Sequence, residues 1–343
     1  MKTSTETSKI SATVDFGATG KQFGHLVVPH STNQSAWGAI EIPIAVISGG
    51  PGPVVFFTGA NHGDEYEGPI ALAKLMGSLQ PGQVQGTVII MPALNLPAFR
   101  AAQRLSPLDG MNMNRAFPGN RDGTVTSMIA HFVSHHILPQ VDVAVDLHAG
   151  GKTLDFMPCA VIHELDDEQQ MGQTLAALKA FAAPTGLVLR ELDAAGMLDT
   201  VVEEMGKVFL STELGGGGTA TPETIAIAET GVRNILAHCG VLDEKPVSRE
   251  DLGLPPTRLM RTPDGSCFTS ARDNGLYEPF KGLGDDVEKG QPLGQIHFIE
   301  TPERPPLVHY AGRAGVILCK GVPGLVGKGD CLAVVAEDYG DGQ

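Results

Sequence analysis

The stretch VVFFTGANH, residues 54–62, joins an uninterrupted apolar run to two polar side chains, Asn61 and His62. Four consecutive apolar residues without alternation are typical of a strand that is buried on both faces of a sheet. The residues from about Glu67 to Leu79 then have the pattern of a helix. This order of strand, polar turn and helix predicts one unit of an α/β fold.

Further apolar runs follow and alternate with helix-like segments. Strands are predicted at Val88–Met91, Val141–Leu147 and Val208–Leu210, and a helix is predicted from about Thr126 to Leu138. The predicted fold class is therefore α/β, with a mostly parallel sheet that is covered by helices on both faces. In such a sheet the functional residues gather at the carboxyl ends of the strands.

Polar residues follow several of these strands directly. His62, Asn95, His148 and Glu213 each come at or just after the end of an apolar run. We therefore expect them to lie together at one edge of the sheet.

The chain changes character after about Gly240. Residues 1–240 are predicted to form the first domain, in which the packing of about residues 1–35 stays open. Residues 241–265 are rich in Pro, Arg and Asp, as a linker or crossover would be, and residues 266–343 are predicted to form a β-rich domain. A faint repeat in this domain has the form V-x-K-G-x-x-L and begins at Val287 and again at Val326. It resembles the halves of a barrel-sandwich domain, and a structural role without a prosthetic group is favoured.

Composition excludes several classes of function. The 343 residues carry a formal net charge of −15, which argues against binding to nucleic acids or to anionic membrane surfaces. The five cysteines are scattered and have no CxxC spacing, so neither a disulfide framework nor a thiolate zinc site is predicted. The first residues lack the apolar segment of a secretion signal, and Gly and Pro interrupt the uncharged residues 42–63. A cytoplasmic protein is predicted.

His62 and Glu65 are candidate metal ligands. Their spacing of three residues, where a strand ends and a helix begins, points both side chains to the same side of the first helical turn. His148, at the end of another strand, is the third candidate, and Asp146 is a candidate to orient one of the histidines. Three ligands of the His and Glu type leave a position open for water in catalytic zinc sites. A His-x-x-Glu pair alone is a weak signal, since such residues are more often ordinary core or surface residues.

Other polar residues are candidates for catalysis and substrate binding. Glu213 closes an apolar strand and precedes a glycine-rich turn, so it is either a general base or a capping, salt-bridging carboxylate. Arg115, with Asn114 beside it, lies in a turn-rich loop and could bind a substrate carboxylate, although a surface arginine is the commoner case. Arg104 is a second cation in that loop that could polarise a carbonyl group.

Four motifs together resemble the succinylglutamate desuccinylase/aspartoacylase family, a branch of the zinc carboxypeptidase-like hydrolases. The motifs are GANHGDEYEG, NMNRAFPG, VDLHAGG and TELGGGG, and they occur in the family's order. The resemblance implies a carboxypeptidase-like domain followed by a β-rich domain, with one zinc ion held by His62, Glu65 and His148. It also implies that Glu213 is the general base and that Asn114 and Arg115 bind the substrate carboxylate. Arg104 carries over only if a small loop insertion is assumed.

Within the family, the stretches SAWGAIEIPI and AGMLDTVVEEMGK are similar to the branch that deacetylates N-α-acetyl-L-2,4-diaminobutyrate in ectoine degradation. That substrate carries an ammonium group, for which Glu203 or Glu204 is a candidate partner; these two residues would otherwise be a solvated helix face. N-acetylaspartate and succinylglutamate are the alternative substrates. An exopeptidase activity, with a peptide as substrate, is a further alternative. A metal-free binding relative is the alternative from another class. A homo-oligomer through exposed β edges stays open.

Overall fold

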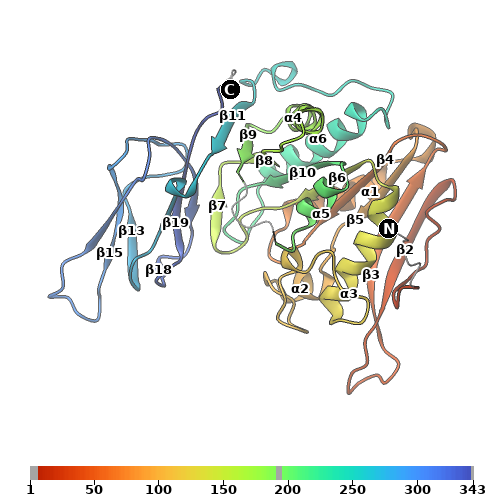
Figure 1. Ribbon diagram of the computed structural model, residues 1–343, viewed down its shortest axis with the longest axis horizontal. Coiled ribbons are helices and arrows are strands. Elements are labelled where there is room, and N and C mark those ends of the chain that lie inside the picture. Colours follow the sequence, from red (N-terminus) through yellow and green to blue (C-terminus); the bar gives the residue numbers. More distant parts are fainter. Residues whose placement is uncertain (1–6, 191–194, 341–343) are drawn as a thin grey trace.

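The computed structural model describes residues 7–190 and 195–340 (Figure 1). Within them, a large mixed sheet has the strand order β1-β2-β3-β5-β4-β6-β10-β8-β9-β11-β19-β17-β14, with β7 and β12 paired beside β17 and β19. Its strands are β1 (Ser11–Ala12), β2 (Gly20–Pro29), β3 (Ala39–Ser48), β4 (Val54–Gly59), β5 (Thr87–Met91), β6 (Val143–Leu147), β7 (Leu154–Phe156), β8 (Cys159–His163), β9 (Thr185–Leu189), β10 (Val208–Glu213), β11 (Arg258–Thr262), β12 (Phe268–Ser270), β14 (Asp286–Val287), β17 (Gly315–Gly321) and β19 (Cys331–Asp338).

The strands predicted from apolar runs are confirmed as β4, β5, β6 and β10, and these neighbours run parallel to one another. Antiparallel pairs occur on both sides of them, where β3 joins β5 and β8 joins β10. The sheet is therefore parallel at its centre, as predicted, and mixed as a whole. Antiparallel partners need no helical crossover, which explains why β2 and β3 follow each other as a long hairpin.

Helices cover both faces of this sheet (Figure 1). One face packs against α1 (Glu67–Ser78), α4 (Glu168–Phe181) and α6 (Pro222–His238), and the other against α2 (Leu96–Ala101), α3 (Val125–Phe132) and α5 (Leu198–Glu204). The helix α3 continues as a π-helical turn, Val133–Ile137, so the predicted helix up to Leu138 is confirmed. Short 3₁₀ turns span Pro81–Gln83, Met113–Arg115, Leu138–Gln140, Glu250–Leu252 and Gly265–Cys267.

The neighbouring residues Phe56 and Phe57 show why the central strands have no polar face. Both side chains are fully buried, Phe56 in the core beneath α2, α3 and α5, and Phe57 in the core beneath α1, α4 and α6. Successive side chains of a strand point to opposite faces, so a sheet with two covered faces needs apolar residues at every position.

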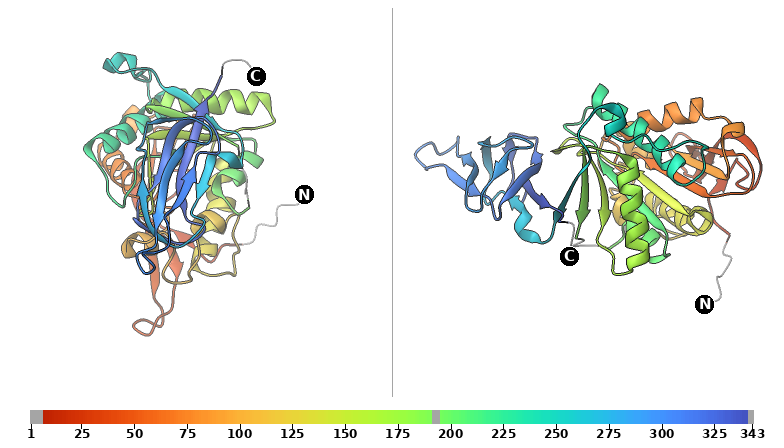
Figure 2. Two further views of the ribbon diagram at one scale, coloured as in Figure 1. Left: turned by 90° about the vertical axis from the view of Figure 1, so that its left-hand side faces the viewer. Right: turned by 90° about the horizontal axis from the view of Figure 1, so that it is seen from above.

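The C-terminal residues form a β-rich domain that stands beside the helix-covered sheet (Figure 2). A second sheet of order β16-β15-β13-β18 contains β16 (Leu307–Tyr310), β15 (Pro292–His297), β13 (Gly275–Pro279) and β18 (Leu325–Val326). The repeated residues Val287 and Val326 are both buried, which fits their prediction as equivalent positions in two halves. The segment expected as a linker, residues 241–265, contains β11, which pairs with β9 and β19 and so extends the large sheet towards this domain.

Two sequence expectations concern the ends of the chain and membranes. Residues 1–6 lie outside the described part, and the rest of the N-terminal segment adds β1 and β2 to the sheet edge. In the described ranges, no helix is both long enough and apolar enough to cross a bilayer.

Candidate metal centre

The candidate site is built where three adjacent parallel strands end. His62 follows β4, His148 follows β6, and Glu213 is the last residue of β10. Between β4 and α1 the chain turns sharply: Ala60 has a positive φ of 48°, and a Cβ on Gly63 would lie 2.0 Å from the carbonyl carbon of Ala98. Only glycine fits at that second position, because any side chain would collide with the backbone of α2. This turn brings His62 back over the sheet edge.

His62, Glu65 and His148 converge on one point. Each offers a ligand atom, and these atoms all lie within 4.8 Å of one another. Nδ1 of His62 is 2.7 Å from Oε1 of Glu65, and Nδ1 of His148 is 2.9 Å from Oε2 of the same carboxylate. Within the described residues this is the one cluster of at least three His, Cys, Asp or Glu side chains with such geometry. The site is also buried, with exposed fractions of 3% to 8%.

The second nitrogen of each imidazole has its own partner. Nε2 of His148 lies 2.8 Å from Oδ2 of Asp146, which also accepts a hydrogen bond from the amide of Asn61 at 2.7 Å. Nε2 of His62 lies 3.2 Å from Oδ1 of Asn112. Both partners are acceptors, so Nε2 is assigned as the protonated nitrogen in each ring. The two Nδ1 atoms therefore present lone pairs to the centre of the cluster.

This arrangement fits a cation. If Nε2 carries the proton, the lone pair of a neutral Nδ1 points at the carboxylate of Glu65. Two hydrogen-bond acceptors that face each other repel, unless a positive charge lies between them. Removal from water opposes ionisation of Glu65, and positive charge on His62 and His148 would outweigh it and lower the pKa of this carboxyl. With both imidazoles neutral, a bound cation would supply that positive charge instead. Two imidazole nitrogens and one ionised carboxylate are the donor set that zinc takes in catalytic sites. The residues present therefore fit a zinc ion.

Glu213 stands beside this cluster with the properties of a general base. Its Oε2 is buried and has no hydrogen-bond partner among the described residues. Loss of contact with water, with the negative charge of Glu65 adding to it, raises the pKa of Glu213 to about 8. A carboxylate whose pKa lies near neutrality can take a proton and release it again.

The structure also brings Arg104 to the cluster. Its Nη1 lies 3.2 Å from Nδ1 of His62 and 3.8 Å from Oε1 of Glu65, while half of its side chain stays exposed. A guanidinium in this place can stabilise negative charge that develops on a substrate oxygen.

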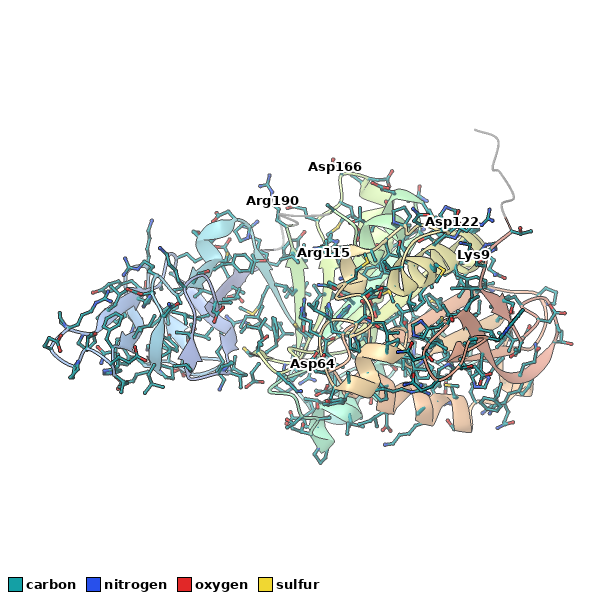
Figure 3. The ribbon with its side chains drawn as sticks, turned by 90° about the horizontal axis from the view of Figure 1, so that it is seen from below. Lys9, Asp64, Arg115, Asp122, Asp166 and Arg190 are labelled. Carbon is teal, nitrogen blue, oxygen red and sulfur yellow. The ribbon has the colours of Figure 1, made fainter. Side chains whose placement is uncertain are left out.

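Asn114 and Arg115 lie in the same loop, in the 3₁₀ turn Met113–Arg115. Oδ1 of Asn114 accepts a hydrogen bond from the backbone of Leu198, so this side chain anchors the start of α5. Nη1 of Arg115 donates to the carbonyl of Asn114 at 2.7 Å, and the guanidinium is exposed. Figure 3 places Arg115 and Asp64 near the middle of the long axis, where the helix-covered part adjoins the C-terminal strands.

Glu203 and Glu204 do not lie at this site. Glu203 pairs with Nδ1 of His163 at 3.1 Å, and Glu204 is exposed. Both residues lie at the end of α5 that adjoins Lys207. Lys207 immediately precedes the first residue of β10, and Glu213 is the last residue of β10. At about 3.3 Å per residue, the length of β10 separates them from Glu213 by roughly 16 Å. The interpretation of these two residues as partners of a substrate ammonium is therefore not retained.

Sequence reasoning missed residues that contact the cluster or lie behind it. Asn112 lies two residues before Asn114 in the same motif and contacts His62. Asp64 accepts a hydrogen bond from the backbone of Lys152 and holds the loop after His148 in place. Glu67 is also buried, and removal from water raises its pKa to about 7. All three stand in motifs that contain a candidate ligand or binding residue, and this proximity was the one signal that could have found them.

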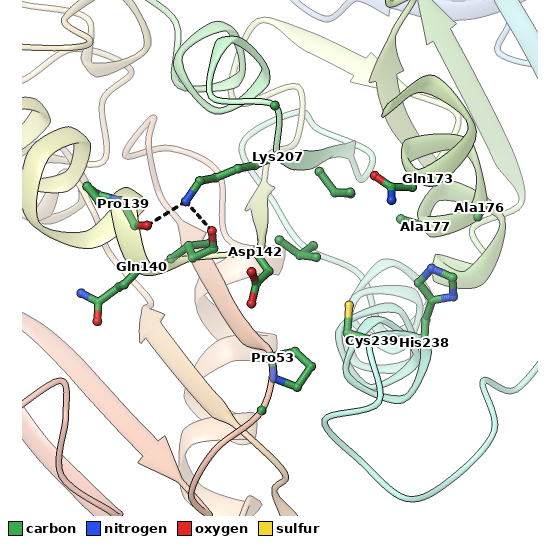
Figure 4. A pocket seen from close by; sticks show the side chains of 15 residues that line it. Pro53, Pro139, Gln140, Asp142, Gln173, Ala176, Ala177, Lys207, His238 and Cys239 are labelled. Atoms are coloured by element: carbon green, nitrogen blue, oxygen red, sulfur yellow. Dashed lines mark hydrogen bonds between the residues drawn. The ribbon is translucent and has the colours of Figure 1, made fainter. Parts of the chain in front are cut away.

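A cavity at the other end of these strands does not carry this chemistry. It has a volume of about 820 Å³ and is lined by residues at the amino ends of β4, β6 and β10, among them Pro53, Asp142 and Lys207 (Figure 4). The ammonium of Lys207 binds the carbonyls of Pro139 and Val141 and caps the end of the preceding helical turns. The cavity is therefore at the opposite edge of the sheet from His62 and His148.

Comparison with known proteins identifies the family. The model of the succinylglutamate desuccinylase/aspartoacylase catalytic domain matches residues 51–239, which include every member of the candidate centre. The chain belongs to this family. Among curated relatives, it is 46% identical over 331 residues to the N-alpha-acetyl-L-2,4-diaminobutyric acid deacetylase of Halomonas elongata, covering 96% of this chain and 95% of the relative.

Solved structures of family members agree with the fold over nearly the whole chain. The product-bound ectoine utilization protein EutE (DoeB) of Ruegeria pomeroyi is 46% identical, with a TM-score of 0.93 and coverage of 97% and 99%. The succinylglutamate desuccinylase/aspartoacylase of Rhodobacter sphaeroides is 41% identical, also with a TM-score of 0.93, and coverage is 97% and 100%. The C-terminal β domain is thus a shared part of these proteins.

Proposed function

We propose that this chain is a zinc-dependent deacetylase that hydrolyses N-α-acetyl-L-2,4-diaminobutyrate to acetate and 2,4-diaminobutyrate in ectoine degradation. The substrate is supported by the 46% identity, over 331 residues, to the Halomonas elongata deacetylase named above. The chemistry is supported by the buried cluster of His62, Glu65 and His148 next to Glu213. We place the reaction in the cytoplasm, because all five cysteines are free and the cytoplasm keeps thiols reduced.

His62 and His148, each through Nδ1, and the carboxylate of Glu65 would hold the zinc ion. A zinc ion bound there would polarise the acetyl carbonyl and acidify the attacking water. Asp146 and Asn112 keep the two imidazoles in the tautomer that this requires, because each accepts the hydrogen bond of an Nε2–H group.

Glu213 would move the proton of the reaction. As a carboxylate it takes a proton from the water that attacks the acetyl carbon, and it then delivers this proton to the nitrogen of the leaving amine. The C–N bond breaks with transfer of its electron pair to that nitrogen, so acetate and the free amine leave. The guanidinium of Arg104 would stabilise the negative charge on the carbonyl oxygen while the tetrahedral carbon forms.

Arg115 and Asn114 would bind the α-carboxylate of the substrate. Nη1 of Arg115 donates to the carbonyl of Asn114, and a guanidinium has further N–H donors with which to bind a carboxylate. Arg115 is exposed, which leaves room for the substrate, and a planar guanidinium binds a carboxylate with two parallel hydrogen bonds.

The decisive experiment measures acetate or succinate release by the zinc-loaded protein from four substrates. These are N-α-acetyl-L-2,4-diaminobutyrate, N-γ-acetyl-L-2,4-diaminobutyrate, N-acetylaspartate and N-succinylglutamate. We expect the α-acetyl compound to have the highest kcat/KM. Preference for an acidic substrate would overturn the substrate and keep the chemistry. Absence of turnover on all four, with zinc bound, would overturn the proposed activity.

We also propose that residues 1–240 and 266–343 act as two domains, with the β edges of the second available to a further copy of the chain. The exposed edge strands β14 and β16 have one described neighbour each, which leaves one side open for pairing. Size-exclusion chromatography with light scattering would measure the oligomeric state.

A further inference from the structure

Thr212 connects two parts of the candidate site without belonging to it. It directly precedes Glu213 at the end of β10, beside the end of β6, which His148 follows. Its side chain is fully buried. Successive side chains of a strand point to opposite faces of the sheet, so Thr212 points away from the face that carries Glu213. It is therefore not placed to contact the metal position, and none of the roles proposed above uses it.

The hydroxyl of Thr212 binds both backbone groups of His148. Its Oγ1 accepts a hydrogen bond from the backbone N–H of His148 at 3.1 Å. The same Oγ1 donates a hydrogen bond to the carbonyl oxygen of His148 at 3.0 Å. A hydroxyl can do both, because it has one donor and two acceptor positions. An apolar side chain of the same size would leave the N–H group of His148 without this partner.

These hydrogen bonds replace one step of the sheet ladder. The register of the parallel strands β6 and β10, continued by two residues, places His148 opposite Glu213. In a parallel ladder, a residue bonds to the two residues that flank its partner. One of these bonds is regular, from the N–H of Leu214 to the carbonyl of His148 at 3.1 Å. For the N–H of His148, the hydroxyl of Thr212 takes the place that a backbone carbonyl has in a regular ladder.

A proposed zinc ligand and the proposed general base thus depend on one hydroxyl group. Thr212 fixes the backbone of His148 against β10, and Glu213 is the next residue of that strand. Asp146 anchors the imidazole ring at Nε2, which sets the direction of the ring and leaves the position of the backbone to Thr212. Functional groups have to be held within about 0.5 Å of their productive positions. The bonds of Thr212 provide such a constraint between the two strands.

We propose that Thr212 is a positioning residue that sets the distance between the zinc ligand His148 and the general base Glu213. This inference rests on the proposed zinc-dependent hydrolysis. Loss of the hydroxyl lowers the zinc affinity, because His148 shifts, and lowers kcat, because Glu213 shifts relative to the attacking water. KM changes little, since Arg115 binds the substrate from a different loop. The effect on zinc binding is measurable without any turnover.

Two substitutions separate the hydroxyl from the shape of the side chain. Thr212→Val removes the hydroxyl and keeps the size, so no space opens for water. We expect its zinc affinity to fall ~10-fold or more, as for loss of an outer contact of a ligand histidine. We expect its kcat to fall ~10- to 100-fold, as for a small misplacement of a reacting group, with KM within ~3-fold of the wild type. Thr212→Ser keeps the hydroxyl and should retain a zinc affinity and a kcat close to those of the wild type.

Thr174→Val is the matched control. It makes the same change of atoms at a fully buried threonine of α4, whose hydroxyl has no hydrogen-bond partner among the described residues. This variant should keep the zinc affinity and the kcat of the wild type. Zinc affinity is measured by competition with a chromophoric chelator, kcat and KM by acetate release, and folding of each variant by urea unfolding.

A wild-type value of either quantity in Thr212→Val would overturn the proposal. An equal loss in Thr212→Ser would overturn it too, because the hydroxyl would then not be the cause. Should Thr212→Val not fold, Thr212→Cys offers a weaker donor and acceptor and must bind zinc less tightly than Thr212→Ser; equal affinities would refute the role. A wild type that binds zinc and turns over none of the four substrates would overturn the proposed activity alone, and the zinc affinities would still decide on Thr212. A wild type that binds no zinc would overturn both proposals.

Discussion

Asp146 offers a sharp test of the candidate metal centre, because it touches the proposed ligand His148 without contacting the metal position itself. Its Oδ2 accepts two hydrogen bonds, from Nε2 of His148 at 2.8 Å and from the amide of Asn61 at 2.7 Å. Its Oδ1 is buried and has no hydrogen-bond partner among the described residues. An asparagine can therefore keep its oxygen at the Oδ2 position and place its amide nitrogen where Oδ1 now lies.

Asp146→Asn should thus preserve both hydrogen bonds and remove only the negative charge behind His148. Asp146→Ala should remove the hydrogen bonds as well and leave Nε2–H and the Asn61 amide unpaired. Outer partners of ligand histidines contribute about 10- to 100-fold in metal affinity, or about 1.4 to 2.7 kcal/mol. We expect Asp146→Asn to weaken zinc binding ~10-fold and Asp146→Ala ~100-fold. The unpaired buried groups should cost Asp146→Ala a further ~1–3 kcal/mol in the free energy of unfolding.

Zinc affinity is measured by competition with a chromophoric chelator, and stability of the metal-free variants by urea unfolding. Glu223→Gln, on the exposed first turn of α6, is the control for loss of one carboxylate and should leave the zinc affinity unchanged. If both Asp146 variants bound zinc as tightly as the wild type, the assignment of His148 Nδ1 as a ligand oriented by Asp146 would be refuted. A loss of stability without a loss of zinc affinity would refute that assignment equally.

Four further predictions follow from the site and the packing. Glu213→Gln should retain zinc, measured by metal analysis, and lower kcat ~10²- to 10⁴-fold, since it removes the proton carrier; unchanged turnover would exclude a general base at this position. Arg115→Ala should mainly raise KM for the substrate, and an unchanged KM would remove it from the carboxylate site. Removal of zinc by a chelator should lower the unfolding midpoint and abolish turnover, and re-addition should restore both; full activity of the metal-free protein would contradict the zinc mechanism. Gly231→Ala should destabilise the protein by ~1–3 kcal/mol in urea unfolding, because its Cβ would lie 2.2 Å from the Phe181 ring between α4 and α6; a gain in stability would show that the two helices can separate.

The sequence predicted the strands best where burial on both faces of the sheet allows only apolar residues. Phe56 and Phe57 fill two different cores, so the strand that carries them has to be apolar throughout and is readable from composition alone. The strands of the C-terminal half of the large sheet are less readable. β8 pairs with β10, and β19 pairs with β11 and β12. These antiparallel partners are far away in the chain, and no local pattern specifies them.

Loops and helix ends position several side chains in and around the site, and local sequence patterns do not predict which residues these side chains contact. Nothing in the neighbourhood of Glu203 reveals that α5 runs back along β10 and carries this residue to the far end of the strand, against His163. Arg104 shows the opposite case, since the long loop after β5 returns its guanidinium to His62, 42 residues away in the sequence. Such returns are set by tertiary packing, which spacing along the chain does not encode.

The charges at this sheet edge explain why the cluster fits a divalent ion. The carboxyl groups of Glu65, Glu67, Asp146 and Glu213 gather there, and each is buried or partly buried. Removal from water raises the pKa of Glu67 to about 7 and that of Glu213 to about 8, so these two groups are largely or partly protonated at neutral pH. With neutral imidazoles, the guanidinium of Arg104 is the one nearby side-chain cation in the hydrogen bonds and ion pairs of the described residues around Glu65. The carboxylates of Glu65 and Asp146 then exceed this single positive charge, and a divalent ion between His62 and His148 would compensate the difference.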